Sequence, residues 1–175
     1  MLSKRTLKLL NEQIGHEFYS SNLYLAMCSW CGAKGLRGSA AFLEKHADEE
    51  MMHMRKLFAY VNDTGAQAIV PEIPKPPHDF ESIKDVFAKT LEHEIFITGK
   101  INDLVDACLA DKDHSTVNFL QWYVAEQHEE ERLFRSIVDL VNLIGVEAGG
   151  LYLADKEIGE MAAAKASAPA QGTAT

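Results

Sequence analysis

Four glutamates occupy positions where an apolar side chain is expected. Each lies near the middle of a stripe of apolar residues spaced three and four apart, and they are Glu17, Glu50, Glu94 and Glu130. This spacing is typical of a helix face that enters a core, so each carboxylate belongs to a buried stripe. A residue at the midpoint of a helix keeps its height whichever way the helix runs. We therefore expect the four carboxylates to converge on one layer.

Carboxylates that share a dry core need positive charge, because burying even one unpaired ionised carboxylate costs several kcal/mol. No lysine or arginine occupies the four stripes, which leaves raised pKa values with shared protons, or bound cations. His53 follows Glu50 by three residues on the same face, and neutral imidazole is a common metal ligand. A single glutamate in such a stripe is often a register-setting residue, but four of them with a histidine indicate a metal site.

A ligand set made mostly of carboxylates suits Fe(II) or Mn(II) better than structural zinc. Glu50 is central and close to His53, which makes it the natural bridge between two metals about 3.5–4 Å apart. With iron, such a pair is an oxygen-reactive di-iron centre.

A second set of acidic residues flanks these positions. It is either a solvated acidic face or an acidic path and third metal position beside the central pair. Its members are Glu49, Glu126 and Glu129, together with Glu130.

Helix-breaking residues define the elements that must position these side chains. Four of the five prolines fall within residues 66–81, and Ser82 with Asp85 three residues later predicts a helix start. The remaining breakers divide the chain into helices over 3–32, 38–64, 82–111 and 115–144, with a shorter one over 151–162.

The proline-rich link between the second and third helices is long for a bundle. Its 16 residues, if extended, cover about 50 Å, and helices of about 30 residues are about 45 Å long. The link can therefore return along the whole bundle. The sequence predicts an all-α fold, a four-helix bundle with one long crossover and a short fifth C-terminal helix.

Composition restricts the class of protein. The 175 residues suit one domain, with 162–175 predicted to be a disordered tail of small and polar residues. The net charge of −9 opposes a nucleic-acid or anionic-membrane partner, and no apolar run reaches the ~18–20 residues of a membrane span. Three cysteines without secreted-type spacing favour a reducing compartment, so we expect a cytoplasmic protein.

Three long segments of this pattern, residues 11–24, 42–54 and 118–130, resemble those of prokaryotic non-haem ferritins. The resemblance covers residues 1–161 and implies a ferritin-like di-iron domain. It implies a ferroxidase centre whose first iron binds Glu17, Glu50 and His53, and whose second iron, bridged by Glu50, binds Glu94 and Glu130 with Gln127 nearby. It also implies a third iron site made of Glu49, Glu126, Glu129 and Glu130.

The same resemblance implies a function. Similar ferritins oxidise Fe(II) with dioxygen or hydrogen peroxide and store the ferric mineral inside a homo-oligomeric cage of 24 subunits. Iron, as Fe(II) and Fe(III), is then the metal, and no haem is expected. Tyr24 lies two turns after Glu17, where it is implied to donate electrons near the site; it could equally be a core tyrosine that bonds a carboxylate.

Two alternatives compete with this interpretation. A haem-containing bacterioferritin would use a methionine at the place of Met51, but its second Glu-x-x-His is replaced here by Gln127 and Glu130. A metal-free helical scaffold would bind no Fe(II).

The helix over 151–162 is expected to dock at a subunit junction. The other histidines are expected at the surface or behind the ligands: His16, His46, His78, His93, His114 and His128.

Overall fold

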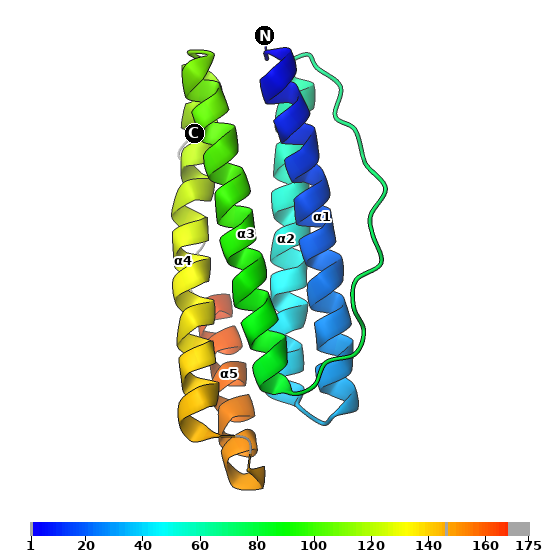
Figure 1. The fold of residues 1–175 in the computed structure, drawn as a ribbon, viewed down its shortest axis with the longest axis vertical. Helices are drawn as coiled ribbons and strands as arrows, with labels where there is room; N and C mark the ends of the chain where they lie inside the picture. Colours follow the sequence, from blue (N-terminus) through cyan, green and yellow to red (C-terminus); the bar gives the residue numbers. More distant parts are fainter. Residues whose placement is uncertain (1, 146, 168–175) are drawn as a thin grey trace.

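The computed structural model describes residues 2–145 and 147–167, and this part of the chain is helical without β-strands (Figure 1). The four long helices begin and end within one residue of their predicted bounds, which confirms the all-α bundle. The helices are α1 (Lys4–Ala33), α2 (Arg37–Asp63), α3 (Ile83–Ala110), α4 (His114–Ile144) and α5 (Ala148–Ser167).

Short turns join α1 to α2 and α3 to α4, so each pair is antiparallel. Gly35 in the first turn has φ +79°, in the left-handed region that glycine adopts without strain. Residues 64–82 form the predicted crossover, which runs along the outside of α1 from one end of the bundle to the other (Figure 1). The second and third helices are consequently parallel.

The first half of the crossover contacts α1 at two places. The Ile69 amide donates a hydrogen bond to Asn11 Oδ1 over 2.7 Å. Pro71 lies over Gly15, where an added Cβ would be 2.8 Å from Pro71 Cγ. At its far end, Ser82 Oγ accepts a hydrogen bond from the Asp85 amide, which confirms the predicted start of α3.

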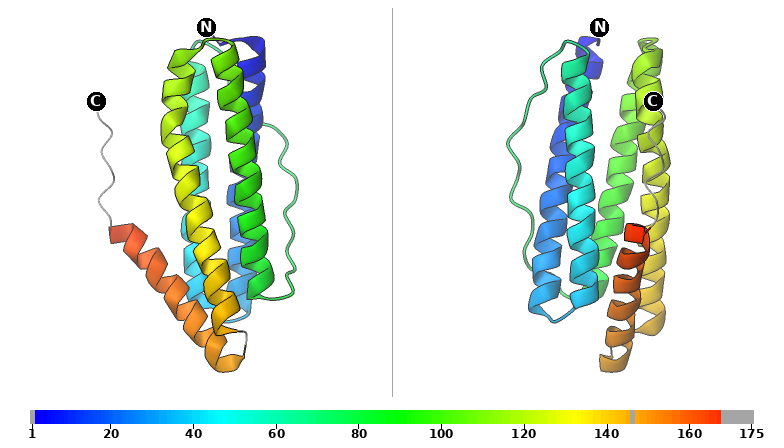
Figure 2. Two further views of the ribbon diagram at one scale, coloured as in Figure 1. Left: turned by 60° about the vertical axis from the view of Figure 1, so that its left-hand side comes forward. Right: turned by 180° about the vertical axis from the view of Figure 1, so that it is seen from behind.

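The fifth helix is longer than predicted and lies against α2 and the end of α4 (Figure 2). Asp155 accepts hydrogen bonds from the Gly38 and Ser39 amides at the start of α2, where Leu36 offers no side-chain cap. The helix continues through Ser167, so it includes the first residues of the segment predicted as a tail. Residues 168–175 lie outside the described residues.

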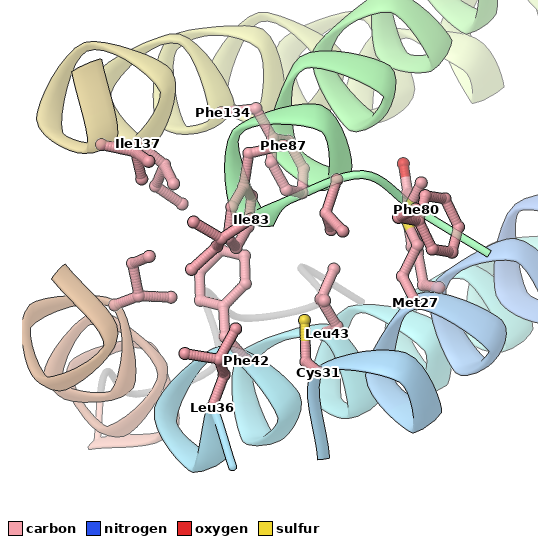
Figure 3. Close-up of a cluster of buried hydrophobic side chains, with 14 of the residues drawn as sticks. Met27, Cys31, Leu36, Phe42, Leu43, Phe80, Ile83, Phe87, Phe134 and Ile137 are labelled. Atoms are coloured by element: carbon pink, nitrogen blue, oxygen red, sulfur yellow. The ribbon is translucent and has the colours of Figure 1, made fainter. Parts of the chain in front are cut away.

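Two separate apolar clusters fill the bundle. The cluster near α5 includes Phe42, Phe87 and Phe134 (Figure 3). The cluster nearer the N-terminus includes Leu57 and Ile97. The layer between these clusters is where the candidate site lies.

Within residues 2–145 and 147–167, no helix is long and apolar enough to cross a membrane.

Candidate metal centre

The four mid-helix glutamates all lie between the two apolar clusters. In each helix, the buried apolar residues before the glutamate belong to one cluster and those after it belong to the other. Glu17, for example, follows Ile14 of the cluster nearer the N-terminus and precedes Leu23 of the cluster near α5. The carboxylates are buried, with exposed fractions of 0% for Glu17, 5% for Glu50, 1% for Glu94 and 4% for Glu130. The structure therefore brings them to one layer, as the stripes predict.

Glu17, Glu50 and His53 converge in this layer. His53 Nδ1 lies 3.2 Å from Glu50 Oε2 and 3.8 Å from Glu17 Oε2. One ligand atom from each of the three residues falls within 4.8 Å of the others. The group that the resemblance implies for a first iron is thus already assembled.

Glu94 is held by hydrogen bonds on both oxygens. The Tyr24 hydroxyl donates to Oε1, and Gln127 Nε2 donates to Oε2 over 2.5 Å. Glu94 and Glu130 are close enough to Glu50 to raise its pKa by charge repulsion. Among the described residues, however, these three carboxylates do not form a group with all ligand atoms within 4.8 Å.

Burial and mutual repulsion make these carboxylates weak acids. Desolvation, followed by the charge of Glu50, holds the pKa of Glu17 well above its usual value. Desolvation and the charge of Glu94 do the same to the pKa of Glu50. Desolvation raises the pKa of Glu94 to about 7, against the lowering effect of the Tyr24 hydrogen bond. No lysine or arginine nitrogen of the described residues lies within 4.0 Å of these three side chains to offset the charge.

The metal-free protein should therefore lose stability as the pH rises. The pKa of Glu94 is about 7 in the folded protein and near 4.5 in the unfolded chain. The stability that its raised pKa contributes is therefore fully present below pH 4.5 and is lost as the pH rises through about 7. At pH 8 the ionised group costs roughly 3 kcal/mol. With chelator present, Glu94→Gln should resist denaturant better than wild type at pH 8 and similarly to it at pH 5.

The exposed Glu92 on the same helix supplies the control. Glu92→Gln should follow the wild-type pH dependence. Identical pH dependences for wild type and Glu94→Gln would contradict the account of Glu94.

The residues implied for a third iron do not all come together. Glu126 is half-buried and Glu129 is exposed, and neither joins a group of ligand atoms within 4.8 Å in the described part of the chain. Glu49 and Glu130 do form such a group, with His46.

Two buried residues near the site, Gln13 and His46, were not assigned as ligands from the sequence. Gln13 Nε2 donates to Glu17 Oε1 over 2.5 Å and lies 3.4 Å from the Tyr123 hydroxyl. His46 was expected at the surface or behind the ligands, and it is buried. Gln13 precedes Glu17, and His46 precedes Glu50, by four residues on the same helix face. That spacing is the signal that could have found them.

Two aromatic side chains pack beside the site. Tyr24 is a buried tyrosine whose hydroxyl bonds a buried carboxylate, one of the two roles expected for it. Trp122 stacks on Tyr123, with ring centroids 4.6 Å apart and planes 7° from parallel.

Comparison with known proteins places this geometry in a family. The ferritin family model, described as a ferritin-like domain, matches residues 7–144. A bacterial non-heme ferritin of Campylobacter jejuni is 56% identical over 162 residues, 93% of this chain and 97% of the relative. A probable bacterial non-heme ferritin-like protein of Haemophilus influenzae is 54% identical over 161 residues, 92% and 98% of the two chains.

A solved structure agrees with these relatives. The open-pore ferritin of Archaeoglobus fulgidus matches with a TM-score of 0.88 and 38% identity, over 91% of this chain and 98% of that chain. The chain belongs to the ferritin family. Within it, the relatives place the chain among bacterial non-haem ferritins.

Proposed function

We propose that this iron-storage ferritin oxidises Fe(II), with dioxygen or hydrogen peroxide as the acceptor, at a ferroxidase centre formed by its own mid-bundle carboxylates. Two Fe(II) ions would supply two electrons to dioxygen, which takes up two protons and leaves as hydrogen peroxide. The ferric product would then be stored as a mineral. The observation that carries the proposal is the convergence of Glu17, Glu50 and His53, with no lysine or arginine of the described residues paired to the two carboxylates.

The described residues have separate tasks in this proposal. His53 and Glu17 would bind the first iron. Glu50 contacts His53 and is close enough to Glu94 and Glu130 to interact with their charges, so it would bridge to the second iron. Glu94 and Glu130 would complete the second position, and the release of Glu94 from its bonds to Tyr24 and Gln127 would let it turn to the iron.

Tyr24 is placed to assist the oxidation. Its hydroxyl contacts Glu94, a proposed iron ligand, and its ring is fully buried. Desolvation, and then the charge of Glu94, keep the pKa of its hydroxyl well above the usual value, so it stays protonated. It can therefore give an electron together with a proton as the acceptor is reduced, and this is the role we propose for it.

Storage requires an enclosed space that a single bundle of this kind does not provide. We propose that the protein assembles into a cage of 24 copies, in line with its membership of the ferritin family. Glu49, Glu126 and Glu129, with Glu130, would supply a third iron position during transfer inward. A cytoplasmic location would give the cage its supply of Fe(II).

An oxidation assay on the assembled protein tests this function. Fe(II) is added without air at two ions per subunit, and dioxygen is then admitted. We expect rapid ferric absorbance well above the rate of a protein-free blank, and iron that elutes with the protein during size exclusion. Oxidation at the blank rate, with ferric precipitate separate from the protein, would contradict the proposal.

The fifth helix gives a second test, of the cage alone. Truncation at Gly149 removes α5, including the Asp155 side chain that caps α2. We expect the truncated chain to elute as species much smaller than the wild-type assembly. An intact large shell after truncation would show that α5 is not needed for assembly.

A further inference from the structure

A second group of possible ligands lies beside the proposed iron pair. It consists of His46, Glu49 and Glu130, with one ligand atom from each within 4.8 Å of the others. His46 Nε2 lies 3.4 Å from Glu130 Oε2 and 3.7 Å from Glu49 Oε2. A metal bonded to its ligands at about 2.0–2.1 Å in a tetrahedron separates them by about 3.4 Å. The spacing in the group is therefore close to that of a tetrahedral metal site.

The histidine is oriented as a metal ligand. His46 Nδ1 lies 2.8 Å from the Phe42 carbonyl oxygen, which can only accept a hydrogen bond, so Nδ1 carries the hydrogen. In the neutral ring, Nε2 then keeps its lone pair and faces the two carboxylates. Metal-binding histidines usually donate their other ring N–H in this way, which fixes the tautomer.

The nitrogen that faces the carboxylates has no hydrogen-bond partner. His46 is 1% exposed, and its Nε2 atom is buried without a hydrogen bond. The ring is also fixed by its neighbours. It stacks on Phe42, with ring centroids 4.1 Å apart, and meets Phe134 edge-on, with ring centroids 5.2 Å apart. Both phenylalanines are labelled in Figure 3. A buried polar atom without a partner is uncommon in folded proteins and calls for a ligand.

We infer that His46, Glu49 and Glu130 bind one divalent transition-metal ion, such as Zn(II) or Fe(II), through His46 Nε2 and the two carboxylates. This position shares Glu130 with the proposed pair. It differs from the third position implied by the resemblance, because it has a nitrogen ligand and does not use Glu126 or Glu129. A nitrogen ligand makes the position better suited to zinc than an all-oxygen site.

Zinc counting on the assembled, metal-free protein tests the inference. Equilibrium dialysis against Zn(II) should find one tightly bound ion more per subunit in wild type than in His46→Phe. Phenylalanine preserves the ring that packs on Phe42, and the Phe42 carbonyl keeps its bond to the helix backbone. His16→Phe, in a half-buried histidine outside the group, should keep the wild-type count.

The position of the ion gives an independent readout. Crystals soaked in Zn(II) should show an anomalous peak bonded to His46 Nε2 at about 2.0–2.1 Å, and this peak should be missing from His46→Phe. Equal zinc counts in wild type and His46→Phe would overturn the inference. If His46→Phe does not assemble, His46→Gln serves in its place.

The outcomes separate this inference from the proposed function. If the double variant Glu126→Gln with Glu129→Gln loses one zinc ion while His46→Phe keeps the wild-type count, the role of His46 is overturned and the iron pair is untouched. Wild-type protein that binds no ion at all would overturn both.

Discussion

Replacing Glu50 with alanine should lower the initial rate of Fe(II) oxidation by at least about 100-fold, because loss of a residue that only supports a metal ligand already costs about 10–100-fold. Glu50 contacts His53 and lies near enough to Glu94 and Glu130 for their charges to raise its pKa. It is therefore the side chain that both proposed iron positions need. The measurement is stopped-flow absorbance of the ferric product at two Fe(II) per subunit.

Two further variants make this result specific. Glu50→Gln keeps the volume and removes the charge, so it should be nearly as slow as Glu50→Ala. Glu44→Ala, at an exposed position of the same helix, should oxidise iron at the wild-type rate. Fast oxidation by Glu50→Gln, in an assembly of normal size, would show that oxidation occurs elsewhere.

Exchanging both Glu50 and Glu94 for leucine should abolish most of the dependence of stability on metal. The wild type should gain about 5 kcal/mol from two ions at concentrations 100 times their dissociation constants, a rise in melting temperature of about 10–20 °C. The double variant lacks ligands for both positions and should lose most of this rise. Without metal at pH 8 it should melt above the wild type, since apolar replacement of buried charges is often stabilising by about 1–4 kcal/mol.

Thermal unfolding with chelator and with Mn(II), which is not oxidised during the scan, measures both effects. Glu44→Leu with Glu92→Leu, at two exposed positions on the same helices, should keep the wild-type response to Mn(II). If the protein were instead a metal-free scaffold, Mn(II) would not raise the melting temperature of the wild type. Equal melting temperatures with chelator and with Mn(II) would support that alternative.

The central layer was predictable because it depends only on helix periodicity. Glu17, Glu50, Glu94 and Glu130 lie on apolar stripes near the midpoints of helices, and the structure brings them to the junction of the two apolar clusters. The start of α3 was predictable for a local reason, since Ser82 Oγ accepts a hydrogen bond from the Asp85 amide and Asp85 Oδ2 accepts one from the Glu81 amide.

Other features depend on contacts that a stripe does not specify. His46 and Glu50 share a helix face, but only the fold shows that His46 Nε2 faces Glu130 from another helix. Glu126 and Glu129 are close to Glu130 in sequence, yet rotation along α4 leaves one half-buried and the other exposed.

The length of α5 was missed for a related reason. The alanines after Met161 favour a helix but form no apolar stripe, so periodicity gave no signal there. The helix is instead anchored earlier, by Asp155 at the start of α2 and by the close approach of Gly38 and Gly159. A Cβ on Gly38 would lie 1.9 Å from the Asp155 carbonyl oxygen, so this contact requires glycine.

Anomalous diffraction from a crystal soaked in Fe(II) without air tests most directly whether the buried carboxylates of this layer bind metal. We predict two iron peaks per subunit about 3.5–4 Å apart, one bonded to Glu17, Glu50 and His53 and the other to Glu50, Glu94 and Glu130. A layer without iron, with the four carboxyl groups still in their present positions or turned toward solvent, would contradict the account.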